Sequence, residues 1–532
     1  MNPNTHIIQK LQVSLTASQR ENTLHLQQRF ERMLEEQLLP RLEPVFDRLA
    51  GPEAWIELGQ LEVPLSRLDP QASEADWLEK TCRACIGALE QEMQKPAATK
   101  RSGSPENALA VLACFLERGH LPWWVEDYEL EAAVQNIIPT QAPSILKLLR
   151  PVNAQKRWAR QFGPAIQEQL LRATGKNPFL SQREWRDLFP ELTAQKSSLV
   201  YWETIWEARE QPGSFTENWM RNLLLQSLHL LPADKALRKL SALHENAAPL
   251  HRLCSIAQEL FPFTPAQWAK ILPRQKARQV YWEAFREAKT APVDFRQNWV
   301  DLLVRKTMLA GLGDSGWAAL METVRQSPAL SGPQKDQLQA AIAGRQLPVL
   351  PASLEEGAFL PPLPIDEQGI YVSLAGIVMA HPFLPAFFGR LKLLEGEQFK
   401  DEAARERAVH LLYFLAAGRQ NPAEQETVLL KLLCGMELGR PIEKEAALSE
   451  TEKAEANRLL ESMIQNWDAL EGSCPDDLRG SFLIRAGKLQ KNEMGWQLKV
   501  EQQAFDILLG QLPWGLSPVL HPWMPEMLWV EW

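Results

Sequence analysis

The chain has 532 residues, which is too many for a single hydrophobic core and indicates about three domains. Its 57 basic and 66 acidic residues give a formal net charge of −9, so the composition predicts no general attraction to nucleic acid or anionic lipid. Six cysteines do not make a disulfide scaffold, and the opening "MNPNTHIIQKLQVSL" lacks the basic start and long apolar run of a signal peptide. We therefore expect a reduced, cytoplasmic protein that binds no nucleic acid.

A small β-α-β unit is predicted within residues 1–94. Apolar and polar residues alternate between Leu11 and Leu15, as they do in a strand, and a long amphipathic helical stretch follows. The segment "WIELGQLEVPL", Trp55 to Leu65, is typical of a second strand. The long connection favours parallel pairing of the two strands. A further helix is expected from about Asp76 to Met93, before a polar linker at residues 95–106.

Residues 107–346 have a helical pattern that repeats. The segment "YWETIWEAREQPGSFTENWM", Tyr201 to Met220, returns 80 residues later as "YWEAFREAKTAPVDFRQNWV", Tyr281 to Val300, with 9 of 20 positions identical. The duplicated parts cover about residues 180–231 and 263–311. Units in tandem bury their apolar faces on each other and form a spacer or platform. An old duplication inside one globular helical domain fits the pattern equally well.

A C-terminal domain at residues 366–532 follows a proline-rich linker at residues 347–365. It is expected to be mainly helical, with a capping box of Ser449 and Glu452 at the start of one helix. The stretches "WQLKVEQ" and "LWVEW" alternate like short strands. The fold class predicted for the chain is therefore mainly α, with a few short strands.

One stretch is long enough to span a bilayer, because Gly369 to Gly389 contains no Asp, Glu, Lys or Arg. His381, Pro382 and Pro385 interrupt it. The prolines would break a helix and the imidazole would be stranded in lipid. We predict a buried core segment here and no membrane span.

The best motif for catalysis is "GLGDSG", Gly311 to Gly316, which satisfies GxGxxG and also looks like a serine-protease run. A dinucleotide fingerprint must follow a strand, and a protease needs an all-β scaffold. The preceding "DLLVRKTMLA" is instead the repeat partner of a helical segment. The glycines are therefore expected to end one helix before another begins at Trp317.

Cys82 and Cys85 have the spacing of a metal or redox pair. Structural zinc needs four ligands, and the nearest candidates, Cys114 and His120, do not form a second close pair. Cysteines within an amphipathic helix commonly act as small buried hydrophobes. No catalytic, cofactor-binding or metal-ligating residue is assigned, and no cofactor is expected.

Strings at both ends of the chain resemble the tape measure proteins of extracellular contractile injection systems. They include "HIIQKLQVSL", "FLERGHLPWW", "HPFLPAFFGRLKLLEG", "FLIRAGKL", "GWQLKVEQQAFDILLGQLPWGLS" and "HPWMPEMLWVEW". The resemblance covers roughly residues 1–125 and 365–532. It implies a structural component of a headless, phage-tail-like particle that sets the length of the inner tube, assembles in the cytoplasm and lies inside the tube afterwards. It brings no catalytic residues.

Three hypotheses follow, in order of preference. The first is a length-determining component in contact with the inner tube, baseplate or spike hub. The second is an assembly factor or adaptor that is not retained, which the compact domains implied by 38 prolines and 19 tryptophans favour. The third is a metal-dependent enzyme using Cys82, Cys85 and a histidine.

Tryptophans are the candidate partner-binding residues, because indoles in excess of core needs often anchor interfaces. The candidates are Trp123, Trp124, Trp514, Trp523, Trp529 and Trp532. The last four have two alternatives: to fold back as the final strand and plug of the C-terminal core, or to insert into a partner such as a baseplate hub or tube-initiating ring. Both alternatives can hold together.

Overall fold

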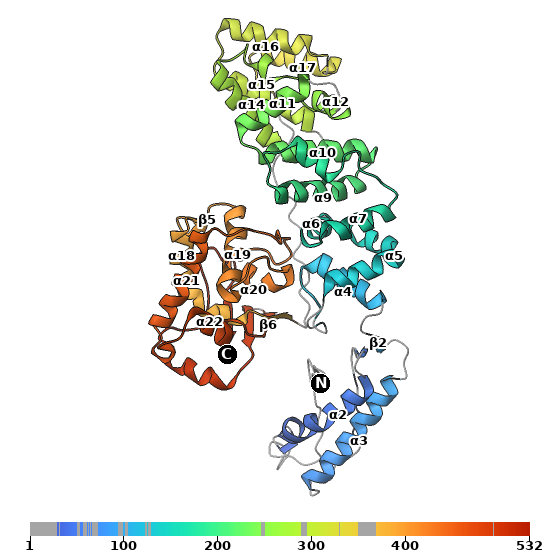
Figure 1. The fold of residues 1–532 in the computed structure, drawn as a ribbon, viewed down its shortest axis with the longest axis vertical. Helices are drawn as coiled ribbons and strands as arrows, with labels where there is room; N and C mark the ends of the chain where they lie inside the picture. The colour runs from blue at the N-terminus through green and yellow to red at the C-terminus, as the bar shows by residue number, and fades with distance from the viewer. Residues whose placement is uncertain are drawn as a thin grey trace. The chain divides into compact units, whose positions relative to one another are not determined.

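The computed structural model divides the chain into two compact units (Figure 1). Unit 1 contains residues 1–148, 365–440 and 446–532, and unit 2 contains residues 149–364 and 441–445. The residues that the structure describes are 29–30, 32–50, 54–56, 61, 63, 65, 73–93, 99–101, 105–122, 125, 129–245, 251–288, 295–328, 330–348, 369–492 and 494–532. They are mainly helical with a few short strands, which confirms the predicted fold class at that level.

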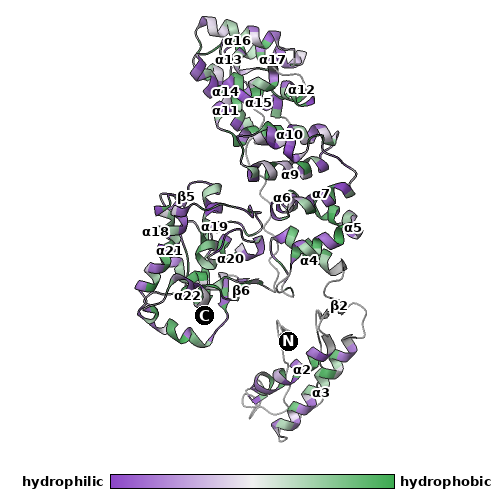
Figure 2. Cartoon of the chain, viewed as in Figure 1, coloured by the Kyte–Doolittle hydropathy of each residue, from purple (hydrophilic) through white to green (hydrophobic). Residues whose placement is uncertain are grey.

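The N-terminal part of unit 1 is built on helices. Its elements are the π-helical turn η1 (Leu34–Leu38), α2 (Leu39–Ala50), β1 (Ala54–Ile56), α3 (Glu74–Met93), β2 (Thr99–Arg101), α4 (Pro105–Arg118) and α5 (Leu130–Leu148). The helix α3 has both polar and apolar residues along its length (Figure 2), as a helix on one side of a core requires. It agrees with the helix predicted from Asp76 to Met93. Ser73 caps its first turn by accepting a hydrogen bond from the backbone N–H of Asp76 at 3.2 Å.

A core cluster joins η1, α2 and α3. Its buried residues are Phe30, Met33, Leu34, Leu38, Leu42, Trp77 and Leu78. The Arg29 guanidinium lies 4.4 Å from the Trp77 ring centroid and also contacts Glu74, with 3.2 Å between Nε and Oε1. The Arg29 guanidinium therefore packs on Trp77 at the edge of this small core.

The predicted β-α-β unit is tested only in part. The first expected strand, Leu11 to Leu15, lies outside the described residues. Of the second, Trp55 and Ile56 lie in β1, whereas the described residues Leu61, Val63 and Leu65 lie in no strand. The strand β1 pairs antiparallel with β2 in the register Ala54 to Arg101 and Ile56 to Thr99. The strand β2 lies within residues 95–106, which were predicted to be a linker. The sequence did not indicate that part of this linker pairs with β1.

Unit 2 is a succession of helices. They are α6 (Val152–Gln161), α7 (Pro164–Ala173), α8 (Gln182–Leu188), α9 (Ala194–Glu210), α10 (Phe215–Leu230), α11 (Ala233–Glu245), α12 (His251–Leu260), α13 (Pro265–Trp268), α14 (Arg274–Ala288), α15 (Phe295–Leu309), α16 (Asp314–Gln326) and α17 (Gly332–Ala343). Figure 1 shows α9 beside α10, and the pair α14 and α15 is packed in the same way.

The two segments that match in sequence make matching contacts. Tyr201 of α9 donates a hydrogen bond to the Leu180 carbonyl at 2.9 Å, and Tyr281 of α14 donates one to the Phe263 carbonyl at 2.7 Å. Each tyrosine meets a buried tryptophan edge-to-face, Tyr201 with Trp219 at 5.5 Å and Tyr281 with Trp299 at 5.1 Å between ring centroids. The identical tyrosine and tryptophan, Tyr201 with Trp219 and Tyr281 with Trp299, are thus core residues in both segments.

Among the described residues of unit 2, three helices begin with a capping box, in which a hydroxyl and a Glu or Gln side chain satisfy each other's backbone N–H groups. The pairs are Ser181 with Glu184, Thr264 with Gln267, and Ser331 with Gln334. The residue before each cap is buried; these residues are Leu180, Phe263 and Leu330. The same local signal therefore starts a helix three times along unit 2.

The C-terminal part of unit 1 contains a four-stranded sheet in the order β3-β6-β7-β8. Its strands are β3 (Ile370–Val372), β6 (Gly487–Asn492), β7 (Gly495–Val500) and β8 (Leu528–Glu531). The strands β6 and β7 form an antiparallel hairpin, while β8 lies parallel to β7 with Trp496 opposite Leu528. The two short strands predicted here, in "WQLKVEQ" and "LWVEW", are β7 and β8.

The rest of this domain is mainly helical. Its helices are η4 (Ala375–Phe383), α18 (Leu384–Arg390), α19 (Glu402–Ala417), η5 (Glu424–Thr427), α20 (Val428–Leu433), α21 (Glu450–Gln465), η6 (Asp468–Leu470), α22 (Pro475–Leu478), η7 (Arg479–Leu483) and η8 (Ala504–Gln511). A two-residue hairpin, β4 (Leu394–Glu395) with β5 (Gln398–Phe399), completes the domain. The predicted capping box of Ser449 and Glu452 starts α21.

The apolar stretch Gly369 to Gly389 forms part of this domain's core. It contains β3, the 3-10 helix η4 and most of α18, and Ala375 to Ala380 are all buried. Within the described part of the chain, no helix is both long enough and apolar enough to cross a bilayer. The centre of the stretch is buried in protein, whereas Tyr371, Pro382 and Pro385 are exposed at its two ends.

Candidate interaction site

The segment that carries the candidate tryptophans, residues 512–532, first contacts η4. The Trp514 indole N–H donates to the Met379 carbonyl at 3.0 Å, and the Trp514 ring meets Phe383 edge-to-face at 5.1 Å between centroids. Both partners belong to the buried 3-10 helix. Trp514 is half-buried and is therefore tied to the core through its polar as well as its apolar atoms.

Trp523 is a core residue, with 4% of its surface exposed. Its indole N–H donates to the Leu433 carbonyl at the end of α20, at 2.9 Å. Its ring makes edge-to-face contacts with Phe388 at 5.7 Å and Phe399 at 5.3 Å between centroids. Trp523 therefore fills the C-terminal core, as expected if the last tryptophans fold back onto their own domain.

Trp529 has the opposite environment. It follows the fully buried Leu528 on β8, and because side chains alternate along a strand, its indole points away from the core with 38% of its surface exposed. Its N–H lies 3.4 Å from the Met494 carbonyl. The Met494 side chain is itself 72% exposed. An outward indole beside an exposed methionine is a surface that a protein partner can cover.

Trp532 contacts a buried arginine. The Trp532 N–H donates to Asp506 Oδ2 at 3.1 Å, and Asp506 Oδ1 accepts from Arg485 Nη2 at 2.7 Å. The Arg485 side chain is 1% exposed, and its guanidinium also lies 4.6 Å from the Phe505 ring centroid. The four C-terminal candidates thus separate into one plug, two half-buried anchors and one outward indole. Trp123 and Trp124 lie outside the described residues.

Sequence reasoning missed the apolar surface of η8. This 3-10 helix, "AFDILLGQ", contains no buried residue, and Ile507 is 81% exposed. The run of apolar letters from Ala504 to Leu516 was a usable signal, because a solvated helix of this kind is normally polar on one side.

A histidine of the segment, His521, lies beside a histidine of η4, His381. His521 is 6% exposed and stacks on Trp523, with 4.7 Å between ring centroids and 16° between planes. His381 of η4 lies 6.1 Å from His521 between ring centroids, and its Nε2 donates to the Gly515 carbonyl at 3.0 Å. Burial, followed by the nearby His381, lowers the pKa of His521 to about 4, and burial also lowers the pKa of His381.

The helix that receives Trp523 is held by a fully buried ion pair. Lys431 Nζ donates to Glu424 Oε1 at 2.8 Å and to the carbonyls of Leu438 at 3.2 Å and Arg440 at 2.8 Å. Both charged side chains are 0% exposed. The three ammonium hydrogens therefore have three acceptors, as a buried lysine requires.

The segment Gly311 to Gly316 follows a helix, as predicted, but the next helix begins at Asp314, three residues before the predicted start at Trp317. The helix α15 ends at Leu309, Gly311 adopts the left-handed φ of +76° that favours glycine, and α16 begins at Asp314 after the cap residue Gly313. The first half of "GLGDSG" thus connects two helices, and Asp314, Ser315 and Gly316 form the first turn of α16. The element directly before the motif is the helix α15, whereas a dinucleotide fingerprint follows a strand and a serine protease requires a β scaffold.

Cys82 and Cys85 are half-buried on α3 and pack against the core cluster around Trp77. Burial, and then Cys82, raise the pKa of Cys85, which disfavours its thiolate. Cys114 Sγ instead donates to the His120 carbonyl at 3.6 Å. Within the described ranges, no group of three or more His, Cys, Asp or Glu side chains is arranged to hold a metal ion.

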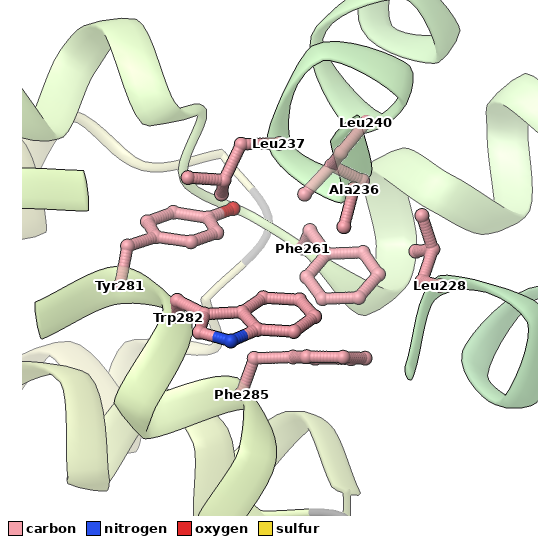
Figure 3. Close-up of a pocket in the computed structure, with 8 residues that line it drawn as sticks. All are labelled: Leu228, Ala236, Leu237, Leu240, Phe261, Tyr281, Trp282 and Phe285. Atoms are coloured by element: carbon pink, nitrogen blue, oxygen red, sulfur yellow. The ribbon is translucent and has the colours of Figure 1, made fainter. Parts of the chain in front are cut away.

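A small cavity lies between the two matching parts of unit 2 (Figure 3). Leu228, Ala236, Leu237, Leu240, Phe261, Tyr281, Trp282 and Phe285 line it. Its volume of about 10 Å³ is no more than one water molecule needs, and the lining side chains are almost entirely apolar. It is a packing gap in an aromatic contact and carries no ligand chemistry.

Comparison with known families gives one result. The sequence pattern of the family described as contractile injection system tape measure protein matches residues 5–532. The chain belongs to this family. The match includes the repeated middle, which the sequence strings at the two ends left outside the resemblance. No curated protein and no solved structure matches the chain.

Family membership directs attention to the surfaces of the tape measure protein. The family is structural and its members work with other components of an injection system. A tape measure protein is therefore expected to bind protein partners. In the described C-terminal part, the outward Trp529 and the exposed apolar residues of η8 are the candidates for such contacts.

Proposed function

We propose that this chain takes part in assembling a contractile injection particle in the cytoplasm, and that its helical middle contributes to the length of the inner tube. The observation that carries the proposal is the family match over residues 5–532. In this proposal the chain lies inside the tube after assembly, with the ends as attachment modules and the middle as the adjustable part.

The matched contacts of unit 2 support two copies of one helical unit, at about residues 180–231 and 263–311. The tyrosine hydrogen bonds, the tyrosine–tryptophan pairs and the capping boxes recur at equivalent places. In a tandem arrangement each unit contacts mainly its neighbours. Removing or adding one unit can therefore change length and leave both ends intact.

The test is a deletion that joins equivalent positions. Removing residues 201–280 joins Val200 to Tyr281, so the junction still reads "VYWE". We expect shorter tubes in electron micrographs. If the deleted 80 residues form one extended helix in the particle, the tubes should shorten by about 120 Å. If they form one layer of packed helix pairs, the tubes should shorten by only about 20 Å.

The matched control inserts a second copy of residues 201–280 after Val280, which should lengthen the tubes by the same amount. Cells lacking the whole chain should then give tubes of scattered length. Tubes of unchanged length in both the deletion and the insertion strain would contradict a ruler.

A second function, an assembly factor that is not retained, is favoured by the closed core of the C-terminal domain. There β8 completes the sheet and Trp523 plugs the interior, so the domain is built to stay folded. This alternative predicts isolated baseplates in cells lacking the chain, and purified particles from wild-type cells in which mass spectrometry finds none of it.

We further propose Trp529 as a contact to the inner tube, baseplate or spike hub. Buried tryptophans at the centre of an interface often contribute about 2 kcal/mol or more, so Trp529→Ala should reduce incorporation into particles by roughly 30-fold. The variant should fold, because β8 pairs with β7 through backbone atoms. Quantitative immunoblotting of purified particles measures the loss. Trp523→Ala is the contrasting variant, since it should destabilise the domain itself.

A further inference from the structure

Two histidine–proline turns lie together although 140 residues separate them in the chain. His381, Pro382 and Phe383 end η4, and His521 and Pro522 precede the core plug Trp523. The rings of the two histidines are 6.1 Å apart between centroids, and His381 holds the Gly515 carbonyl at 3.0 Å. The pair therefore connects η4 to residues 512–532 at two places.

The surroundings of the two histidines are buried and uncharged, which favours the neutral form of the imidazoles. His521 is 94% buried, and its Nε2 has no hydrogen-bond partner among the described residues. Residues 512–519 carry no charged side chain, and β5 contributes the neutral Gln398, which donates to the Pro522 carbonyl at 2.7 Å.

The charged groups on the neighbouring elements offer no compensation. Glu395 of β4 is exposed, and Lys431 of α20 is paired with Glu424. Arg405 of α19 lies over Phe399, at 5.8 Å from its ring centroid, and Phe399 in turn contacts Trp523. The group whose charge acts most directly on His521 is His381. A proton on either ring therefore meets low polarity or a like charge.

We propose that His381 and His521 form an acid-sensitive latch, which holds residues 512–532 on the C-terminal domain at neutral pH and releases them when the two imidazoles become protonated. Release frees Trp514 from η4 and Trp523 from α20 and removes the support of β8. This inference rests on the packing of one domain and does not depend on the proposed function.

The sign of the effect follows from linkage. The ordinary histidine pKa of 6.5 falls to about 4 for His521 in the folded segment, so the folded state binds fewer protons than the open one. The stabilisation is complete above pH 6.5 and decreases as the pH falls toward 4. With these two values, the opening constant of the segment rises about 30-fold at pH 5. His381, whose pKa is also lowered, adds to the effect in the same direction.

Hydrogen exchange of the full chain, measured by mass spectrometry between pH 7.5 and 4.5, tests the latch. The reporter amides are those of Val519 and Leu528, which bond each other's carbonyls at 2.8 and 2.9 Å. The amide of Glu501, which donates to the Ala486 carbonyl at 2.9 Å, and that of Gln497, which faces β6 opposite Gln490, report whether the β6–β7 hairpin stays closed. Comparison with a variant at the same pH removes the pH dependence of the chemical exchange step.

The variants are His521→Phe, which keeps a ring on Trp523 without a titrating group, and His381→Gln, which keeps a donor toward Gly515. The latch predicts that wild-type protection of Val519 and Leu528 falls about 30-fold relative to His521→Phe at pH 5, while hairpin protection is unchanged. His381→Gln should show a smaller loss than wild type.

Equal acid sensitivity in wild type and in both variants overturns the proposal, and so does parallel loss of protection in the β6–β7 hairpin, which would mean unfolding of the whole domain. If His521→Phe is unprotected already at pH 7.5, His521→Gln replaces it as the reference. Wild-type protection that persists to pH 4.5 overturns the latch whatever the variants do.

Discussion

Replacing Lys431 by methionine should lower the free energy of unfolding of the C-terminal domain by about 3–5 kcal/mol. The ammonium is 0% exposed and satisfies Glu424 together with the carbonyls of Leu438 and Arg440. Methionine fills a similar volume, so the loss comes chiefly from a carboxylate left buried without its counter-ion. Urea unfolding, followed by hydrogen exchange in peptides from α19 and α21, measures it.

Two controls isolate this cause. Lys453→Met removes an ion pair with Glu450 whose side chains are 25% and 90% exposed, and it should cost about 0–1 kcal/mol. The double variant Lys431→Met with Glu424→Gln removes the orphaned charge and should recover a large part of the loss. A Lys431→Met protein as stable as wild type would show that the pair contributes little to this core.

Gly435→Ala should destabilise the same domain by about 2–5 kcal/mol. Gly435 follows α20 with φ +63°, where L side chains are strained. A Cβ there would lie 2.0 Å from the Trp523 carbonyl oxygen, a backbone atom that cannot move without displacing the whole turn. The expected result is lower stability together with faster exchange of the Val519 and Leu528 amides.

Gly472→Ala separates the two causes. Gly472 has φ +85°, but nothing lies within 4 Å of a Cβ built on it. It should therefore show only the backbone strain, about 1–2 kcal/mol. Equal losses for the two variants would mean that the close approach of Gly435 to Trp523 is unimportant and that strain explains both.

Many helices could be read directly from the sequence, because their signals are local. Ser449 with Glu452 starts α21, Gly311 and Gly313 lie between α15 and α16, and the alternation in "LWVEW" gives β8. These patterns depend on residues a few positions apart, where backbone propensity and capping act. The pairing partner of a strand is not a local property, because the two strands can be far apart in the chain. The sequence did not show that β1 pairs with Thr99–Arg101 in the expected linker.

The sequence by itself determined the mainly helical class, the matching segments 80 residues apart and the resemblance that the family match confirmed over residues 5–532. Only the tertiary structure decided which tryptophan faces which way. Trp523 and Trp529 are only six residues apart, yet Trp523 is buried in the core and the Trp529 indole faces outward. Burial depends on contacts with Phe388, Phe399 and α20, which lie 90 or more residues away and leave no local signal.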